Sequence, residues 1–121
     1  MITELPFTWL GRAAYGPVLA QQEAQRELVL AAATSDSEGP AAAAEHGFGE
    51  GERIFFVEHD PVVTLGRSAT LANLRVPPEE LARRGVALER GSRGGDVTAH
   101  GPGQLVIYPI VRRGHGVLQY V

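Results

Sequence analysis

The most constraining feature of this chain is residues 91–109, GSRGGDVTAHGPGQLVIYP, a glycine-dense segment that runs directly into a short apolar stretch. Five glycines lie between positions 91 and 103. Glycine is used where the backbone needs a positive φ or must approach a ligand without a Cβ atom in the way. We therefore expect a loop that exposes backbone amides and leads into a strand.

The loop carries one fixed charge. Arg93 stands immediately before Gly94 and Gly95. A guanidinium and two accessible N–H groups can converge on one acceptor, for example a carboxylate, phosphate or thioester oxygen. This arrangement predicts a binding site for an acceptor group.

The residues after the glycines alternate in polarity. Asp96, Thr98 and His100 alternate with Val97 and Ala99. Because alternate residues of an extended segment share a face, we expect a polar face and an apolar back. Asp96 and His100 alone are two donors for a metal ion, with no third ligand at a recognisable spacing, so no metal site is predicted.

Two other glycine-based sites do not fit. A serine-hydrolase elbow needs a glycine two residues before Ser92, where Arg90 stands. A dinucleotide fingerprint that uses Gly101 and Gly103 needs a third glycine at the position of Val106, which lies in the expected strand.

Composition excludes several classes of protein. With 121 residues and 44% hydrophobic content, one domain with a modest core is expected. There is no cysteine and all eleven basic residues are arginine, which excludes cysteine nucleophiles, Schiff-base lysines and P-loops from this chain. A net charge of −3 argues against a nucleic-acid partner. No apolar run approaches the roughly 18 residues of a membrane span and no signal peptide is visible, so a cytoplasmic location is expected.

Hydrophobic periodicity predicts that the chain contains both strands and helices. The apolar run 54–57 is typical of a central strand covered on both faces. Pro109 suggests an edge strand or a strand end. The expected strands are 5–10, 54–57, 62–67, 86–90 and 105–111, the expected helices are 17–33 and 77–85, and 34–52 is an expected flexible loop.

Three details of these elements can be predicted. The first helix is expected to bury a stripe of small side chains: Ala20, Ala24, Leu28 and Ala31. The second has Glu79 and Glu80 four residues before Arg83 and Arg84, which predicts two i, i+4 ion pairs. His59 follows a strand and lies between two carboxylates. It can be a ligand or base, but a side chain that caps a turn or closes a hydrogen bond is favoured.

The run RGGDVTAHGPGQLVIYP (93–109) resembles the signature of the lipoyl (octanoyl) transferase family, where RGG is followed by T, an aromatic residue, H, GPGQ and YP. LGRAAYGPVLAQQEA (10–24) and VEHDPVVTLGR (57–67) resemble the two preceding blocks of that family. Ala99 stands where the family usually has an aromatic residue, a difference that concerns the wall of the acyl pocket.

The resemblance implies an octanoyltransferase of lipoate biosynthesis that works without a cofactor. It also implies an α+β fold like that of biotin and lipoate protein ligases, a mixed β-sheet with helices packed on it. The family moves an octanoyl group from the phosphopantetheine thioester of acyl carrier protein, through an enzyme cysteine, to a lysine of lipoyl domains of 2-oxoacid dehydrogenases and the glycine cleavage system. His100 would orient the reacting groups or relay a proton. The implied substrate-binding residues are Arg93, Gly94, Gly95, Asp96, Val97, Thr98, Ala99 and His100.

The nucleophilic cysteine of the family, and the lysine that lowers its pKa, belong to family sequence beyond the position of Val121. We therefore expect residues 1–121 to be the N-terminal part of a single acyltransferase catalytic domain, incomplete at the C-terminus, where 116–121 begin a further element. Without a thiolate this piece is expected to be inactive alone.

Two other functions stay open. An ATP-dependent lipoate or biotin ligase shares the expected fold, but such ligases usually have a longer glycine run and need a lysine near the acyl-adenylate phosphate. A non-catalytic module that binds acyl groups or carrier protein is the third possibility.

Overall fold

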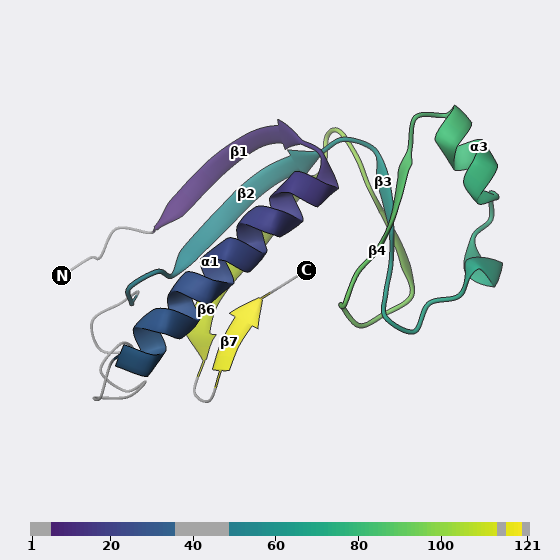
Figure 1. Ribbon diagram of the computed structural model, residues 1–121. Coiled ribbons are helices and arrows are strands. Elements are labelled where there is room, and N and C mark those ends of the chain that lie inside the picture. Colours follow the sequence, from purple (N-terminus) through teal and green to yellow (C-terminus); the bar gives the residue numbers. More distant parts are fainter. Residues whose placement is uncertain (1–5, 36–48, 114–115, 120–121) are drawn as a thin grey trace.

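A computed structural model describes residues 6–35, 49–113 and 116–119 of the chain (Figure 1). Its strands form two mixed sheets, ordered β1-β2-β6-β7 and β4-β3-β5. The α+β class is therefore as predicted, but the strands divide between two sheets. The elements are β1 (Phe7–Ala13), α1 (Tyr15–Ser35), β2 (Arg53–His59), β3 (Val62–Leu65), the 3-10 helix η1 (Leu71–Asn73), α3 (Pro78–Arg83), β4 (Ala87–Arg90), β5 (Val97–His100), β6 (Leu105–Arg113) and β7 (Gly116–Gln119).

The four-stranded sheet begins with a β1–α1–β2 unit. β1 and β2 are parallel, so they need a crossover connection, which α1 supplies along one face of the sheet (Figure 1). The register between β1 and β2 shifts between Trp9 and Arg12, where Gly11 has a φ of 69°. Glycine adopts this conformation without the steric cost that a Cβ atom would bring. The strand therefore continues through Gly11 to Ala13, three residues beyond its predicted end.

The face of α1 that packs on the sheet is not the predicted one. Val18 and Val29 are buried and join the core that Phe55, Val57 and Ile110 form with Tyr108. The small side chains expected to face the sheet are all exposed: Ala20, Ala24, Leu28 and Ala31. Burial of a valine removes more apolar surface from water than burial of an alanine, so the sheet selects the valine stripe.

The opposite face of this sheet is open among the described residues. Phe7 and Trp9 on β1 are 55% and 59% exposed, and Leu105 and Ile107 on β6 are 55% and 47% exposed. β2 is central, between β1 and β6, as predicted. Its expected coverage on both faces is wrong, because its outward residues are only half-buried.

β6 corrects the prediction for Pro109. The strand continues to Arg113 and lies between β2 and β7, so it is neither an edge nor at its end. Antiparallel pairing of β6 with β7 begins at Ile110, one residue after the proline. The missing N–H of Pro109 therefore costs no hydrogen bond to the described part of β7.

The three-stranded sheet is centred on β3, whose four residues are all buried. β4 pairs with β3 in parallel orientation, and β5 pairs with the other edge of β3 in antiparallel orientation. α3 precedes β4, as predicted. Arg83 and Arg84 both pair with Glu80, the latter at 3.0 Å between Nε and Oε1, so only one of the two expected i, i+4 pairs forms.

The remaining predictions concern segments at the limits of the described chain. Of the expected loop 34–52, residues 34 and 35 belong to α1, 36–48 lie outside the described residues, and a turn precedes β2. In that turn the N–H of Glu52 donates to the carbonyl of Gly49 at 3.2 Å. The element expected at 116–121 is β7, and residues 120–121 lie outside the description. No described helix is long and apolar enough to cross a membrane.

Candidate active site

Four polar aromatic side chains from four elements meet where the two sheets adjoin. We call Tyr15, His59, His100 and Tyr108 the polar cluster. The His59 ring lies 5.5 Å from the Tyr15 ring, 6.2 Å from that of His100 and 5.7 Å from that of Tyr108, measured between centroids. Tyr15 begins α1, His59 ends β2, His100 ends β5 and Tyr108 lies in β6. Long-range strand pairing therefore creates the cluster.

His59 is the fully buried centre of the polar cluster. Its Nδ1 lies 3.1 Å from the carbonyl oxygen of Ala13, and its Nε2 lies 2.8 Å from the hydroxyl oxygen of Tyr108. Because a carbonyl can only accept, Nδ1 carries the hydrogen, and the neutral ring accepts the Tyr108 hydroxyl hydrogen at Nε2. The prediction that His59 closes a hydrogen bond is confirmed, and it makes two.

The neighbouring carboxylates do not bind His59. Asp60 accepts a 2.7 Å ion pair from Arg12, and Glu58 accepts a 3.0 Å hydrogen bond from the N–H of Gly103. Burial lowers the pKa of His59; the hydrogen bond to Ala13 opposes this shift, nearby His100 adds to it, and Asp60 opposes it. Burial also raises the pKa of Tyr108. Both groups are therefore neutral at pH 7.

The lowered pKa of His59 predicts a pH dependence of stability. An unfolded histidine takes up its proton near pH 6.5, while the folded His59 does so only at lower pH. The unfolded state therefore binds more protons below about pH 6.5, and the free energy of unfolding falls as pH falls, by at most about 1.4 kcal/mol per pH unit. Between pH 7.5 and pH 5.5 the thermal midpoint should fall further for the unmodified chain than for His59→Gln. Equal falls in the midpoint would contradict a lowered pKa of His59.

Arg93 holds the glycine loop, which we define as residues 91–96, against β3. Its Nη2 donates to the carbonyl and hydroxyl oxygens of Thr64 at 2.7 and 2.8 Å. It also donates to the carbonyl of Asp96 at 3.1 Å, and Nη1 donates to that of Gly94 at 2.8 Å. The guanidinium thus shapes the loop from inside, while Gly94 and Gly95 are exposed.

Gly66 allows the glycine loop to cross the end of β3. A Cβ atom at this position would lie 2.0 Å from the carbonyl oxygen of Gly95. The Gly66 N–H donates to the carbonyl of Asp96 at 2.8 Å, and the Arg67 N–H donates to that of Arg93 at 2.9 Å. The loop can approach this closely only because Gly66 has no side chain.

The strand after the loop only partly follows the expected alternation. Val97 and His100 are half-buried, but Ala99 is exposed, so the apolar back is incomplete. β5 is an edge strand, which leaves this position open. The Asp96 carboxylate accepts from Asn73 at 2.6 Å, and His100 Nδ1 lies 2.7 Å from Gln104 Oε1.

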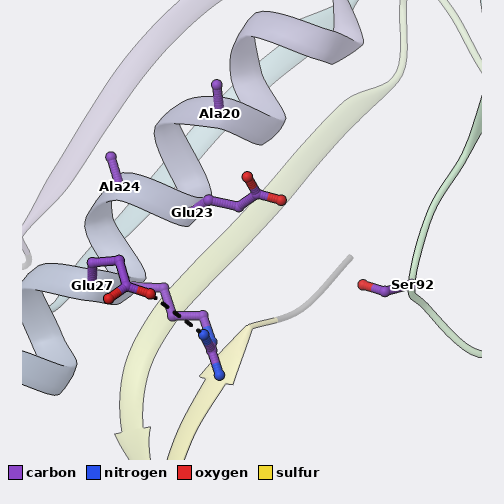
Figure 2. Close-up of a pocket in the computed structure, with 6 residues that line it drawn as sticks. Ala20, Glu23, Ala24, Glu27 and Ser92 are labelled. Atoms are coloured by element: carbon purple, nitrogen blue, oxygen red, sulfur yellow. Dashed lines mark ion pairs between the residues drawn. The ribbon is translucent and has the colours of Figure 1, made fainter.

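A polar cleft of about 660 Å³ lies between α1 and the glycine loop. In Figure 2, Ser92 faces Glu23 across the cleft, and Glu27 forms an ion pair with Arg26 at 3.8 Å. Ala20 and Ala24 supply its apolar lining. Ser92 is exposed.

The structure adds residues that the sequence did not single out, namely Tyr15, Tyr108 and Gly66. All three stand in sequence blocks that carry the family resemblance, which was the available signal. In the described part of the chain, no group of three histidine, aspartate or glutamate side chains could hold a metal ion. The site therefore places the neutral side chains of His59 and Tyr108 near an exposed glycine loop, and the interaction that it offers is hydrogen bonding.

Comparison with curated proteins gives octanoyltransferases. That of Parabacteroides distasonis is 42% identical over 101 residues, which are 84% of this chain and 41% of that protein. That of Acidobacterium capsulatum is 43% identical over 102 residues, which are 84% of this chain and 35% of that protein. The chain thus spans about two-fifths of the length of such relatives.

Solved structures show the same fold. Lipoate-protein ligase A bound with ATP aligns with a TM-score of 0.51 at 18% identity, over 90% of this chain and 37% of that one. The bi-partite lipoate protein ligase from Thermoplasma acidophilum aligns with a TM-score of 0.50 at 19% identity, over 89% of this chain and 36% of that one. The sequence model described as "Lipoyl protein ligase A/B catalytic domain" matches residues 40–121. This chain therefore belongs to the family of lipoyl protein ligase A/B catalytic domains.

Proposed function

We propose that this chain is the acyl-binding part of an octanoyltransferase that carries an octanoyl group from acyl carrier protein to a lysine of lipoyl domains. The observation that carries the proposal is the sequence similarity to octanoyltransferases at 42 to 43% identity over 84% of the chain. The ligases in the structural comparison are below 20% identity and support the fold only.

The proposed acyl site consists of residues 93–100. Gly94 and Gly95 are exposed at the loop, where N–H groups can stabilise the oxyanion that forms when a thioester carbonyl is attacked. Arg93 supports this role indirectly, because its hydrogen bonds hold the loop in shape. His100 lies at the end of the segment, with Nδ1 oriented by Gln104. A ring held in this way can orient a reacting group or relay a proton.

The attacking group comes from outside these 121 residues in this proposal, because the chain contains no cysteine. A thiolate would attack the octanoyl carbonyl and release the carrier thiolate, which takes up a proton. The neutral lysine amine would then displace the enzyme thiolate, lose a proton and form the amide. Both steps need the acyl carbonyl to be held, and neither needs a cofactor. Residues of this chain would hold the acyl carbonyl, while the nucleophile and the lysine that activates it would come from polypeptide outside these 121 residues.

Octanoyl transfer by the purified chain tests the proposal. With octanoyl carrier protein and a lipoyl domain, we expect the chain to bind the octanoyl carrier protein while octanoylation of the lipoyl domain stays at the uncatalysed background. Carrier protein without the octanoyl group is the matched control and should bind more weakly. Mass spectrometry of the lipoyl domain and calorimetric titration give the two measurements.

Three results would contradict this proposal. Transfer at an enzymatic rate would show that the chain has its own nucleophile. Transfer that appears only with octanoate and ATP would favour the ligase function. Equal binding of acylated and unacylated carrier protein would favour a binding module that ignores the acyl group.

A further inference from the structure

The buried hydroxyl group of Tyr15 makes no hydrogen bond to the described residues. Tyr15 is only 3% exposed, and among the described residues its hydroxyl group has no hydrogen-bond partner. Buried hydroxyl groups are nearly always paired, because an unpaired one loses its hydrogen bonds to water without replacement. An unpaired hydroxyl at this position therefore indicates a missing acceptor or donor.

The hydroxyl lies beside the start of the glycine loop. A Cβ atom on Gly91 would be 3.5 Å from the Tyr15 hydroxyl oxygen. Burial raises the pKa of Tyr15; the charge of Arg93 lowers it, and Glu89 and Glu23 raise it. The group is therefore a neutral hydroxyl at pH 7.

The cluster itself does not satisfy this hydroxyl. The neutral His59 ring, 5.5 Å away between centroids, already uses both nitrogens, one with Ala13 and the other with Tyr108. Arg93 can only donate, and it donates to oxygens of Thr64, Gly94 and Asp96. The Tyr15 hydroxyl is thus an unused donor beside Gly91, which precedes the proposed acyl site in the glycine loop.

We propose that the Tyr15 hydroxyl donates a hydrogen bond to the carbonyl oxygen of the bound acyl thioester. This inference rests on the proposed function and names a further substrate-binding residue for it. A thioester carbonyl can only accept, which matches an unused donor. The oxyanion that forms on attack is a stronger acceptor, so the same hydrogen bond strengthens during the reaction.

Tyr15→Phe separates this role from a structural one. The variant keeps the ring and removes a hydroxyl that bonds nothing in the described fold, so the thermal midpoint should stay the same or rise. Tyr108→Phe is the matched control: it removes a hydroxyl that donates to His59, so it should lower the midpoint.

Ligand binding gives the decisive readout. The probes are octanoyl-pantetheine, a thioester, and octyl-pantetheine, a thioether of the same length without the carbonyl. Tyr15→Phe should weaken binding of the thioester about tenfold, which corresponds to one charge-free hydrogen bond of roughly 1.4 kcal/mol, and leave binding of the thioether unchanged. Both affinities are measured by calorimetry on the folded chain.

Each outcome decides the inference. Equal loss for both probes would show that Tyr15 packs against the alkyl chain, and no loss for either would show that its hydroxyl meets only a buried water; both would overturn the inference and leave the proposed function intact. If the unmodified chain binds neither probe, the proposed acyl site is wrong and the role of Tyr15 is wrong with it.

Discussion

Gly66→Ala is expected to destabilise the chain by about 3 kcal/mol or more and to abolish binding of octanoyl carrier protein. The new methyl group would lie 2.0 Å from the carbonyl oxygen of Gly95 and 2.8 Å from its carbonyl carbon. These are backbone atoms, so no side-chain rotation can relieve the contact. The glycine loop must move away from β3, which breaks the Gly66 N–H bond to Asp96 and the hydrogen bonds of Arg93.

Gly101→Ala is the matched control for this prediction. A Cβ atom on Gly101 meets nothing within 4 Å, and its φ is not in the left-handed region. The substitution should therefore change stability by less than about 1 kcal/mol, with either sign. Urea denaturation followed by circular dichroism measures both variants. If Gly66→Ala were as stable as Gly101→Ala, the loop would not cross β3 as described.

His59→Ala is expected to cost about 3 kcal/mol of stability. The imidazole is fully buried, so its removal leaves a cavity among Tyr15, Tyr108 and the end of β1. The Tyr108 hydroxyl loses its acceptor in a buried site. The Ala13 carbonyl keeps the 3.1 Å bond from the Asp60 N–H, so it contributes less to the loss.

Tyr108→Phe separates the hydrogen bond from the packing of His59. It keeps both rings and removes only the hydroxyl, so about 1 to 2 kcal/mol should be lost. Denaturant melts should rank the unmodified chain above Tyr108→Phe and Tyr108→Phe above His59→Ala. A His59→Ala chain as stable as Tyr108→Phe would show that the imidazole is not packed at the centre of the polar cluster.

Local signals predicted most elements well. The proline start and glycine stop around α3, and the apolar stretch that follows, place α3 and β4 within a few residues of their positions in the structure. The expected strands did not include β5. The buried face of α1 could not be obtained in this way. Alanines recur on one side of the helix and valines on another, and only the sheet that it packs on decides which stripe is buried.

Part of the candidate site is likewise local in sequence, and part of it is assembled only by the fold. The glycine loop and His100 stand in one short run of sequence, so their proximity is local. Tyr15 stands far from that run, and Tyr108 lies in the strand that follows it. Gly66 has no functional group that could have drawn attention to it. Their roles depend on contacts between distant parts of the chain. The Tyr15 hydroxyl lies beside Gly91, and the Tyr108 hydroxyl donates to His59. Gly66 lacks the Cβ atom that would collide with the glycine loop.

The sequence by itself determined the order of the elements, the loop with its arginine, the absence of cysteine and lysine, and the resemblance to a transferase family. Only the tertiary structure decided that the strands form two sheets, and that a histidine at the end of β2 accepts from a tyrosine in β6 that is 49 residues away. The physical reason is that propensity and turn chemistry act over a few residues. Which strands pair, and which buried hydroxyl keeps no partner, depends on register and packing across the whole chain.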